Sequence, residues 1–252
     1  MEKQKFRKRV AIALDFPTPE EALAFLDKYF QDKHLLVKVG MELFYASCVA
    51  GVNIVKEITD RGHEIFLDLK LCDIKNTEHN AMAVLKSYDV AAVNLHAFGG
   101  HEMMRAALEG VKRANGTRPL VLAVTVLTSM NQDSINRLLP VEIPLKDLVM
   151  SFANAAIESG LDGIIASVEE ARMIREAFGP DVLIFTPAIR FKGSSVDDQK
   201  RACTPEDARL AGVDVIIMGR DILRAEELRG ESPRAAYERA VREFCGDSNE
   251  EE

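Results

Sequence analysis

Two carboxylates and an amine lie close together in the stretch DLKLCDIKNT, residues 68–77. Asp68 and Lys70 are two positions apart, so in an extended strand their side chains project from the same face. Asp73 adds a second carboxylate just beyond them. A protonated lysine held between acids can stabilise a developing negative charge and then donate a proton to it. An Asp-x-Lys pair at a strand end can equally be a structural ion pair, so the rest of the chain must decide between the two interpretations.

The elements that position these residues recur along the whole sequence. Residues 63–67 form an apolar run with β-propensity, and the apolar side chains after residue 77 follow a helical spacing. The same unit, a short apolar run followed by a helical pattern, appears again and again. The expected strands cover residues 10–14, 35–39, 63–67, 91–96, 120–127, 163–166, 182–185 and 213–218. These runs are continuously apolar, which is typical of strands that are covered on both faces.

Eight strand–helix units without a linker or a change in composition predict a single α/β domain, a (β/α)8 TIM barrel over residues 1–252. An open doubly wound sheet is the competing fold. That fold usually carries a G-x-G-x-x-G turn after its first strand, and no such turn is present there. Helices are expected at about residues 145–159, 169–178 and 233–244. The charged ends, about residues 1–8 and 247–252, are expected to be frayed tails.

The bulk composition limits the classes of function. A hydrophobic content of 47% can form a sizeable core, and a net charge of −8 argues against non-specific binding to nucleic acid. The 4 cysteines form no C-x-x-C pair, so reduced thiols in a cytoplasmic protein are expected, with neither zinc nor disulfides. No apolar run approaches the ~20 residues of a membrane span. The basic start has no apolar segment after it, so we expect no secretory signal.

In a barrel of this kind the functional residues lie at the C-terminal ends of the strands. The expected strand ends carry an unusual set of side chains: Asp15, Lys38, Asp68, Lys70, His96, Thr128, Arg190, Gly219 and Arg220. Singly, each has a structural explanation. Lys38 can lie along apolar surface, His96 can be a hydrogen-bonded core histidine, and Arg220 can be a surface charge. Together, at one end of one barrel, they indicate a binding site.

Two features indicate an anionic ligand. Gly219 allows a ligand to approach the backbone, and the Arg220 guanidinium can bind an oxyanion through two hydrogen bonds. The loops after the seventh and eighth strands are the usual phosphate site of such barrels. The polar segment 191–201, which contains Gln199, is predicted to be a lid that closes over this phosphate, with an ordinary surface loop as the alternative.

These residues resemble the orotidine 5′-phosphate decarboxylase family in its bacterial form. The resemblance runs from about residue 10 to residue 223. It is carried by residues 37–44, 68–77, 124–130, 186–190 and 198–201. The D-x-K-x-x-D element alone marks a wider group of barrels, whereas its combination with Lys38, Arg190 and Gln199 is specific to the orotidylate branch.

Three positions depart from the family pattern. Lys75 stands where proline is usual, and Ala188 replaces a common glycine. Lys75 should lower the stability of the helix only slightly, because proline at that position would only begin the helix. Asp221 follows Gly219 and Arg220 where proline is usual, so it puts a carboxylate near the proposed phosphate site. Its side chain has to turn away for phosphate to bind well.

The resemblance implies a carbon–carbon lyase of de novo pyrimidine biosynthesis that converts orotidine 5′-phosphate to uridine 5′-phosphate (UMP). The reaction needs neither metal nor organic cofactor. Lys70 would stabilise the carbanion at ring carbon C6 and protonate it, while Asp68 and Asp73 would keep Lys70 charged. Asp68 would also face the carboxylate that leaves.

The same resemblance assigns the binding roles and a partner. Asp15 and Lys38 would hold ribose hydroxyls, and Thr128 would contact the pyrimidine. The remaining residues, Arg190, Gln199, Gly219 and Arg220, would bind the phosphate, with Gln199 also reaching the pyrimidine. Asp73 and Thr77 would enter the active site of a neighbouring subunit, which implies a homodimer with shared sites.

Two alternatives stay open. One is another enzyme of the D-x-K-x-x-D group, such as a magnesium-dependent sugar-phosphate decarboxylase or a formaldehyde-condensing synthase. These enzymes hold a metal with acidic side chains, and Lys38 has the wrong charge for that purpose. The other is a non-catalytic nucleotide-binding barrel, supported only by Asp221 and the altered motif positions.

Overall fold

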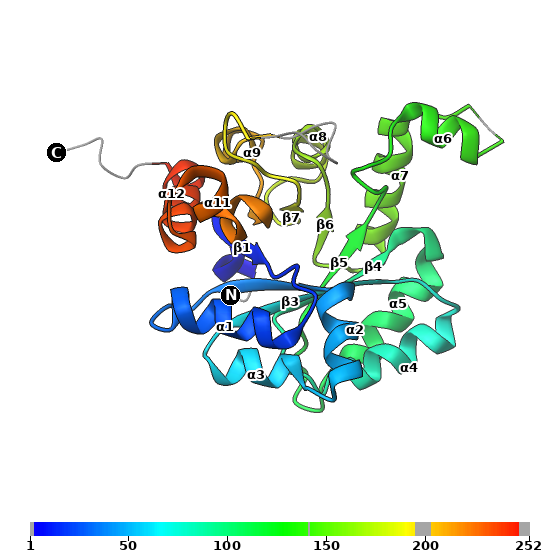
Figure 1. Ribbon diagram of the computed structural model, residues 1–252. Coiled ribbons are helices and arrows are strands. Elements are labelled where there is room, and N and C mark those ends of the chain that lie inside the picture. The colour runs from blue at the N-terminus through cyan, green and yellow to red at the C-terminus, as the bar shows by residue number, and fades with distance from the viewer. Residues whose placement is uncertain (1–2, 141, 195–202, 247–252) are drawn as a thin grey trace.

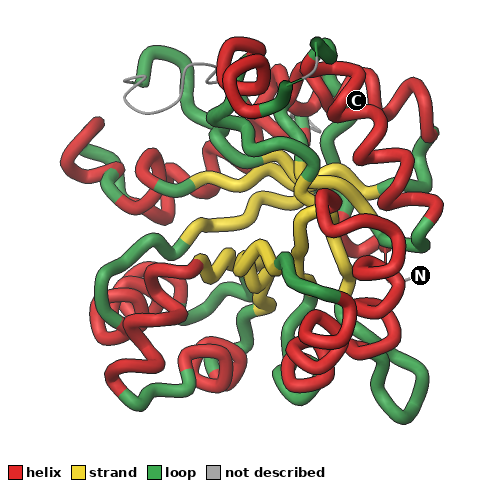
Figure 2. Tube along the Cα trace, turned by 90° about the vertical axis from the view of Figure 1, so that its right-hand side faces the viewer, coloured by secondary structure: helices red, strands yellow, loops and turns green. Residues whose placement is uncertain are grey.

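Eight parallel strands close into a barrel in the order β1 to β8, and β8 pairs back onto β1. The structure is a computed structural model and describes residues 3–140, 142–194 and 203–246. The strands are β1 (Arg9–Ala13), β2 (Leu36–Gly40), β3 (Glu64–Leu71), β4 (Ala92–His96), β5 (Leu120–Val124), β6 (Gly163–Ile165), β7 (Leu183–Thr186) and β8 (Val215–Met218). Helices surround them (Figures 1 and 2), so the predicted (β/α)8 fold is confirmed.

Helices follow every strand, and those after β8 end the described chain. They are α1 (Pro19–Phe30), α2 (Met41–Ala50), α3 (Ile54–Asp60), α4 (Lys75–Leu85), α5 (Gly100–Val111), α6 (Gln132–Leu138), α7 (Leu145–Glu158), α8 (Val168–Phe178), α9 (Pro205–Leu210), α10 (Arg220–Leu223), α11 (Ala225–Arg229) and α12 (Pro233–Cys245). The predictions for α7, α8 and α12 agree to within a residue. The helices α2, α6, α9, α10 and α11 were not predicted, because four of them are short and α2 is apolar on all sides of its axis.

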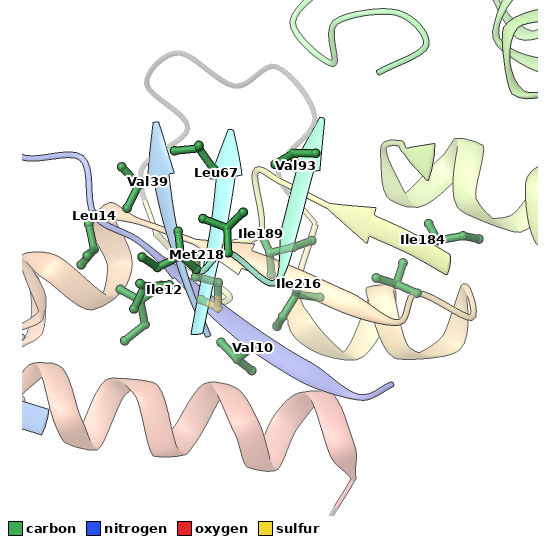
Figure 3. Packing of buried hydrophobic residues seen from close by; sticks show 14 of the residues in the cluster. Val10, Ile12, Leu14, Val39, Leu67, Val93, Ile184, Ile189, Ile216 and Met218 are labelled. Atoms are coloured by element: carbon green, nitrogen blue, oxygen red, sulfur yellow. The ribbon is translucent and has the colours of Figure 1, made fainter. Parts of the chain in front are cut away.

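Alternation along the strands separates two layers of buried side chains. Outward side chains such as Val39, Leu67 and Val93 pack between the barrel and the helices (Figure 3). Inward side chains such as Leu36 and Phe66 fill the barrel itself. Toward the C-terminal ends of β2, β3 and β4 the inward positions turn polar, and this change creates the site. These polar residues are Lys38, Asp68, Asn94 and His96.

The N-terminal segment differs from the expected frayed tail. Lys3–Phe6 form a 3₁₀ helix, η1, and Phe6 is buried among the inward side chains, 6.0 Å from Phe185 between ring centroids. Arg7 also pairs with Asp214 at 3.1 Å. This segment therefore closes the N-terminal end of the barrel. Residues 247–252, the other expected tail, lie outside the described residues.

Two other expectations concern cysteines and membranes. Cys48, Cys72, Cys203 and Cys245 are all free thiols. In the part of the chain that the structure describes, no helix has both the length and the apolar character needed to cross a bilayer.

Candidate active site

Strand β3 carries the acid–lysine pair on a bulge. It runs to Leu71, beyond the expected end at residue 67, and its pairing with β4 changes register between Leu67 and Leu71. Lys70 adopts a left-handed backbone conformation with φ of 52°. Such a conformation costs a non-glycine residue about 1 kcal/mol or more, and it persists only where the surroundings enforce it. The Lys70 Nζ donates to Asp68 Oδ1 at 2.6 Å, so the bulge, and not simple strand alternation, brings the two groups together.

Asn94 on β4 holds this bulge in place. Its side chain is buried, its Nδ2 donates to Asp68 Oδ1 at 2.7 Å, and its Oδ1 accepts the backbone N–H of Lys70 at 2.8 Å. One amide therefore fixes both the carboxylate and the strained backbone of the lysine. Asn94 was not predicted as a site residue. Its signal was a polar side chain at an inward position of an otherwise apolar strand.

Lys38 links the pair to Asp15 and completes a row of alternating charges. Its Nζ lies 2.7 Å from Asp15 Oδ1 and 3.7 Å from Asp68 Oδ2, and its side chain is only 11% exposed. Lys38 and Asp68 are largely shielded from solvent, and this burial is tolerable because each faces an opposite charge. Gly40 leaves space for the amine, since a Cβ at this position would lie 2.9 Å from Lys38 Nζ.

His96 lies beside this row at the end of β4. Burial, followed by the positive charge of Lys70, lowers the pKa of His96, so its imidazole is held neutral. We expected a hydrogen-bonded core histidine. The ring is only half-buried, and it forms no hydrogen bond within the described parts of the chain.

The row of charges borders a cavity of about 210 Å³. The cavity is lined by Asp15, Lys38 and Asp68, and also by Arg190, Gly219 and Arg220. Arg190 follows β7, and Gly219 lies between β8 and α10. The structure thus brings together six residues that were predicted from separate strand ends.

Thr128 lies at the edge of this cavity. Strand β5 ends at Val124, earlier than expected, and Thr128 stands in the loop that follows. It lines a small hollow with Pro187 and Ala188, and the last two residues also line the main cavity. Ala188 has a left-handed backbone with φ of 67°, the conformation that favours glycine.

The Asp221 carboxylate is turned away from the cavity. It is buried, and it accepts hydrogen bonds from the Phe191 N–H at 2.7 Å and from the Ser194 hydroxyl at 2.8 Å. The concern that it would repel phosphate therefore does not apply. Lys75 begins α4 as expected and pairs with Glu102 on α5 at 3.0 Å.

Asp73 and Thr77, which were predicted to act in the site of a neighbouring subunit, do not contact Lys70 of their own chain in the described structure. Asp73 and Thr77 are exposed at the start of α4, and Asp73 Oδ1 accepts the N–H of Ile74 at 2.7 Å. The described residues give Lys70 one ion pair, with Asp68. Gln199 lies outside the described residues, as does most of the predicted lid, residues 195–201.

Glu78 is a buried acid near this segment that was not predicted. Its side chain lies on α4, and its Oε1 has no hydrogen-bond partner among the described residues. Burial, followed by the negative charge of Asp73, raises the pKa of Glu78 to about 7. Across residues 3–140, 142–194 and 203–246, no group of three or more His, Cys, Asp or Glu side chains is arranged to hold a metal ion.

Comparisons with known proteins find similar sequences and structures over most of the chain. A model of the Orotidine 5'-phosphate decarboxylase / HUMPS family matches residues 8–237. The chain is 45% identical over 229 residues to Orotidine 5'-phosphate decarboxylase of Streptococcus thermophilus strain LMD-9, covering 91% of this chain and 94% of the relative. It is also 45% identical over 238 residues to the Bacillus licheniformis enzyme of the same name, covering 93% and 96%.

Solved structures match over almost the whole chain. The crystal structure of Orotidine 5'-phosphate decarboxylase from Lactobacillus acidophilus aligns with a TM-score of 0.79 at 35% identity, covering 94% of this chain and 99% of that one. An uncharacterized conserved protein from Geobacillus kaustophilus aligns with a TM-score of 0.80 at 38% identity, covering 93% and 99%.

Proposed function

The chain belongs to the Orotidine 5'-phosphate decarboxylase / HUMPS family as a decarboxylase of pyrimidine biosynthesis, and from this premise we propose how it acts. It converts orotidine 5′-phosphate to UMP and carbon dioxide, without a metal or an organic cofactor. The observation that carries this proposal is the Asp68–Lys70 contact of 2.6 Å, at the end of a row of alternating charges whose other members line one cavity together with two arginines.

The chemistry follows from where the charges stand. The bond between C6 and the substrate carboxylate breaks, its electron pair stays on C6, and carbon dioxide leaves. The Lys70 ammonium stabilises the resulting carbanion and then transfers a proton to C6, after which solvent restores the lysine proton. Asp68 faces the leaving carboxylate and holds Lys70 in place. Asn94 fixes both partners through its two hydrogen bonds.

The rest of the substrate is held around this centre. Asp15 and Lys38 bind ribose hydroxyls, and Thr128 and Gln199 contact the pyrimidine. The phosphate is bound by Arg190, Gln199, Gly219 and Arg220. Phosphate binding then contributes to the rate as well as to affinity, because it aligns C6 with Lys70.

The charged side chains of the site favour a metal-independent decarboxylase over the metal-dependent enzymes of the D-x-K-x-x-D group. Lys38 Nζ lies between Asp15 and Asp68, so a fixed positive charge stands where a divalent cation would need oxygen ligands. The direct test is the absorbance change when the purified protein meets orotidine 5′-phosphate in the presence of a chelator. We expect full turnover. Activity that requires added magnesium, or binding of UMP without turnover, would reject the proposal.

We further propose a homodimer in which Asp73 and Thr77 complete the active site of the partner subunit. In support, both side chains are exposed, and apolar Ile74 (72% exposed) and Phe98 (71% exposed) lie at the strand ends nearby. Mixing inactive Lys70→Ala and Asp73→Asn chains should restore part of the activity, because a mixed dimer holds one intact site. Absence of recovery in verified mixed dimers would argue against shared sites. The free cysteines fit the cytoplasmic location that we propose.

A further inference from the structure

Asp221 connects the two chain segments that carry the phosphate-binding arginines. It directly follows Arg220, and its side chain is buried at 2% exposure. Its Oδ2 accepts the backbone N–H of Phe191, the residue directly after Arg190, at 2.7 Å. The same oxygen accepts the Ser194 hydroxyl at 2.8 Å. One carboxylate oxygen therefore ties the segment after β7 to the segment after β8.

Further contacts compensate the buried charge and fix the tie. Arg229 on α11 lies 3.8 Å from Asp221 Oδ1, and its Nη2 donates to the Asp221 carbonyl oxygen. The Phe191 ring, itself 2% exposed, lies 4.8 Å from the Arg229 guanidinium and 4.2 Å from that of Arg239 on α12. Such cation–π contacts with two guanidinium groups hold the ring in place. The segment after Arg190 is thus fixed through its backbone and through its side chain.

We infer that Asp221 is a positioning residue for phosphate recognition, an inference that rests on the proposed function. Asp221 does not touch the substrate, since it does not line the cavity that contains Arg190, Gly219 and Arg220. It holds the two arginine-bearing segments at a fixed separation, so that both guanidinium groups meet one phosphate. A carboxylate serves here because a single oxygen can accept from two donors while its charge is balanced by the partly buried Arg229.

Removing the carboxylate should harm the phosphorylated substrate selectively. In Asp221→Ala the Phe191 N–H and the Ser194 hydroxyl lose their acceptor, and the two segments can move apart. We expect kcat/KM for orotidine 5′-phosphate to fall about 10- to 100-fold. The value for orotidine, which lacks the phosphate, should stay within about twofold. Inhibition by UMP should weaken in parallel, whereas inhibition by uridine should not change.

Conservative and matched variants separate positioning from folding. Asp221→Asn keeps an acceptor oxygen but loses the charge, so it should show a smaller loss with the same selectivity. The control is Asp162→Asn at the opposite end of the barrel, a buried acid that accepts the Val121 N–H at 2.8 Å and pairs with Arg118. This control should lower the melting temperature without distinguishing the two substrates. If Asp221→Ala does not fold, the same kinetic comparison of the two substrates with Asp221→Asn decides whether Asp221 has a positioning role.

The outcomes are distinguishable from failure of the proposed function. Equal losses on both substrates, or no loss in a folded Asp221→Ala protein, would overturn the positioning role of Asp221 alone. A wild-type protein that does not decarboxylate orotidine 5′-phosphate would overturn the proposed function. In that case binding of UMP and uridine by calorimetry still tests Asp221. Selective weakening of UMP binding would support its role, and unchanged UMP binding would overturn it.

Discussion

On the β2–β4 side of the barrel mouth the charged side chains stand on strands and pair with one another, whereas on the β7–β8 side the arginines stand on the segments that follow the strands. Asp68 and Lys70 are fixed by a strand bulge and by Asn94. Arg190 and Arg220 depend on a tie made by Asp221, which touches neither the row of charges nor the cavity.

The difference matches what each side has to do in the proposed mechanism. A proton donor must be held to within a fraction of an ångström of its productive position, and strands supply that precision. A phosphate is large and charged, so it can be bound by side chains on loop segments, provided that buried contacts fix these segments. Changes on the strand side should therefore reduce the rate on every substrate. Changes on the loop side should affect only substrates that carry phosphate.

Among changes to the groups around Lys70, the largest effect should come from Asp68→Asn. This change removes the counter-ion that Lys38 and Lys70 share while keeping the shape of the side chain. We expect kcat to fall about a thousandfold on both orotidine 5′-phosphate and orotidine. Steady-state kinetics would measure the loss, and thermal melting would verify the fold. A kcat within tenfold of the wild type would contradict the importance of this pair.

Arg220→Ala should give the opposite pattern on the loop side. The phosphate loses one guanidinium, so kcat/KM for orotidine 5′-phosphate should fall about a hundredfold. The value for orotidine should change little. Competition between the two substrates would measure the ratio directly. Equal losses on both would remove the assignment of the phosphate to this side.

Asn94→Ala should lower kcat less than Asp68→Asn does. Like that change, it should affect orotidine 5′-phosphate and orotidine equally. Without the amide, Asp68 loses a donor and the strained Lys70 backbone loses its acceptor. We expect kcat to fall about 10- to 100-fold with little change in KM. Asn94→Leu, similar in volume, is the control for packing. If Asn94→Leu retained full activity, the amide would have no role in positioning the lysine.

The pH dependence of stability should distinguish two buried acids, Asp221 after β8 and Glu78 after β3. Asp221 faces Arg229, whereas Glu78 has no ion pair among the described residues and its pKa is raised to about 7. Because the folded state keeps a proton that the unfolded chain loses near pH 4.5, Glu78 reduces stability as the pH rises from about 4.5 to 7. Between pH 5 and pH 8 this titration should lower the free energy of unfolding by about 2–3 kcal/mol, and Glu78→Gln should remove that decrease. Urea unfolding of both proteins checks this. Parallel pH profiles would show that Glu78 titrates normally.

The smallest effect concerns Ala188 at the edge of the cavity. Glycine relieves the left-handed conformation at φ of 67°, so Ala188→Gly should raise the unfolding free energy by up to about 1 kcal/mol. Ala106→Gly in the middle of α5 should lower it by a similar amount. Denaturant titration measures both. A loss of stability in Ala188→Gly would show that the turn is not strained.

The sequence was sufficient to predict the barrel, because continuous apolar runs and helical spacing are local patterns. It also predicted strand ends whose side chains line one cavity, because charges such as Lys38 stand out against an apolar strand. Three features depended on contacts between distant segments: the bulge at Lys70, the amide of Asn94 that enforces it, and the direction of the Asp221 side chain. No local pattern specifies which of two strands or loops a buried polar group will reach.

Lys70→Ala tests the central claim most directly. The variant should remain folded and bind UMP, yet its turnover of orotidine 5′-phosphate in the presence of chelator should fall by about four orders of magnitude or more. Lys56→Ala, which removes an exposed lysine on α3, should leave turnover unchanged. Turnover by Lys70→Ala within about tenfold of the wild type would mean that another group protonates C6.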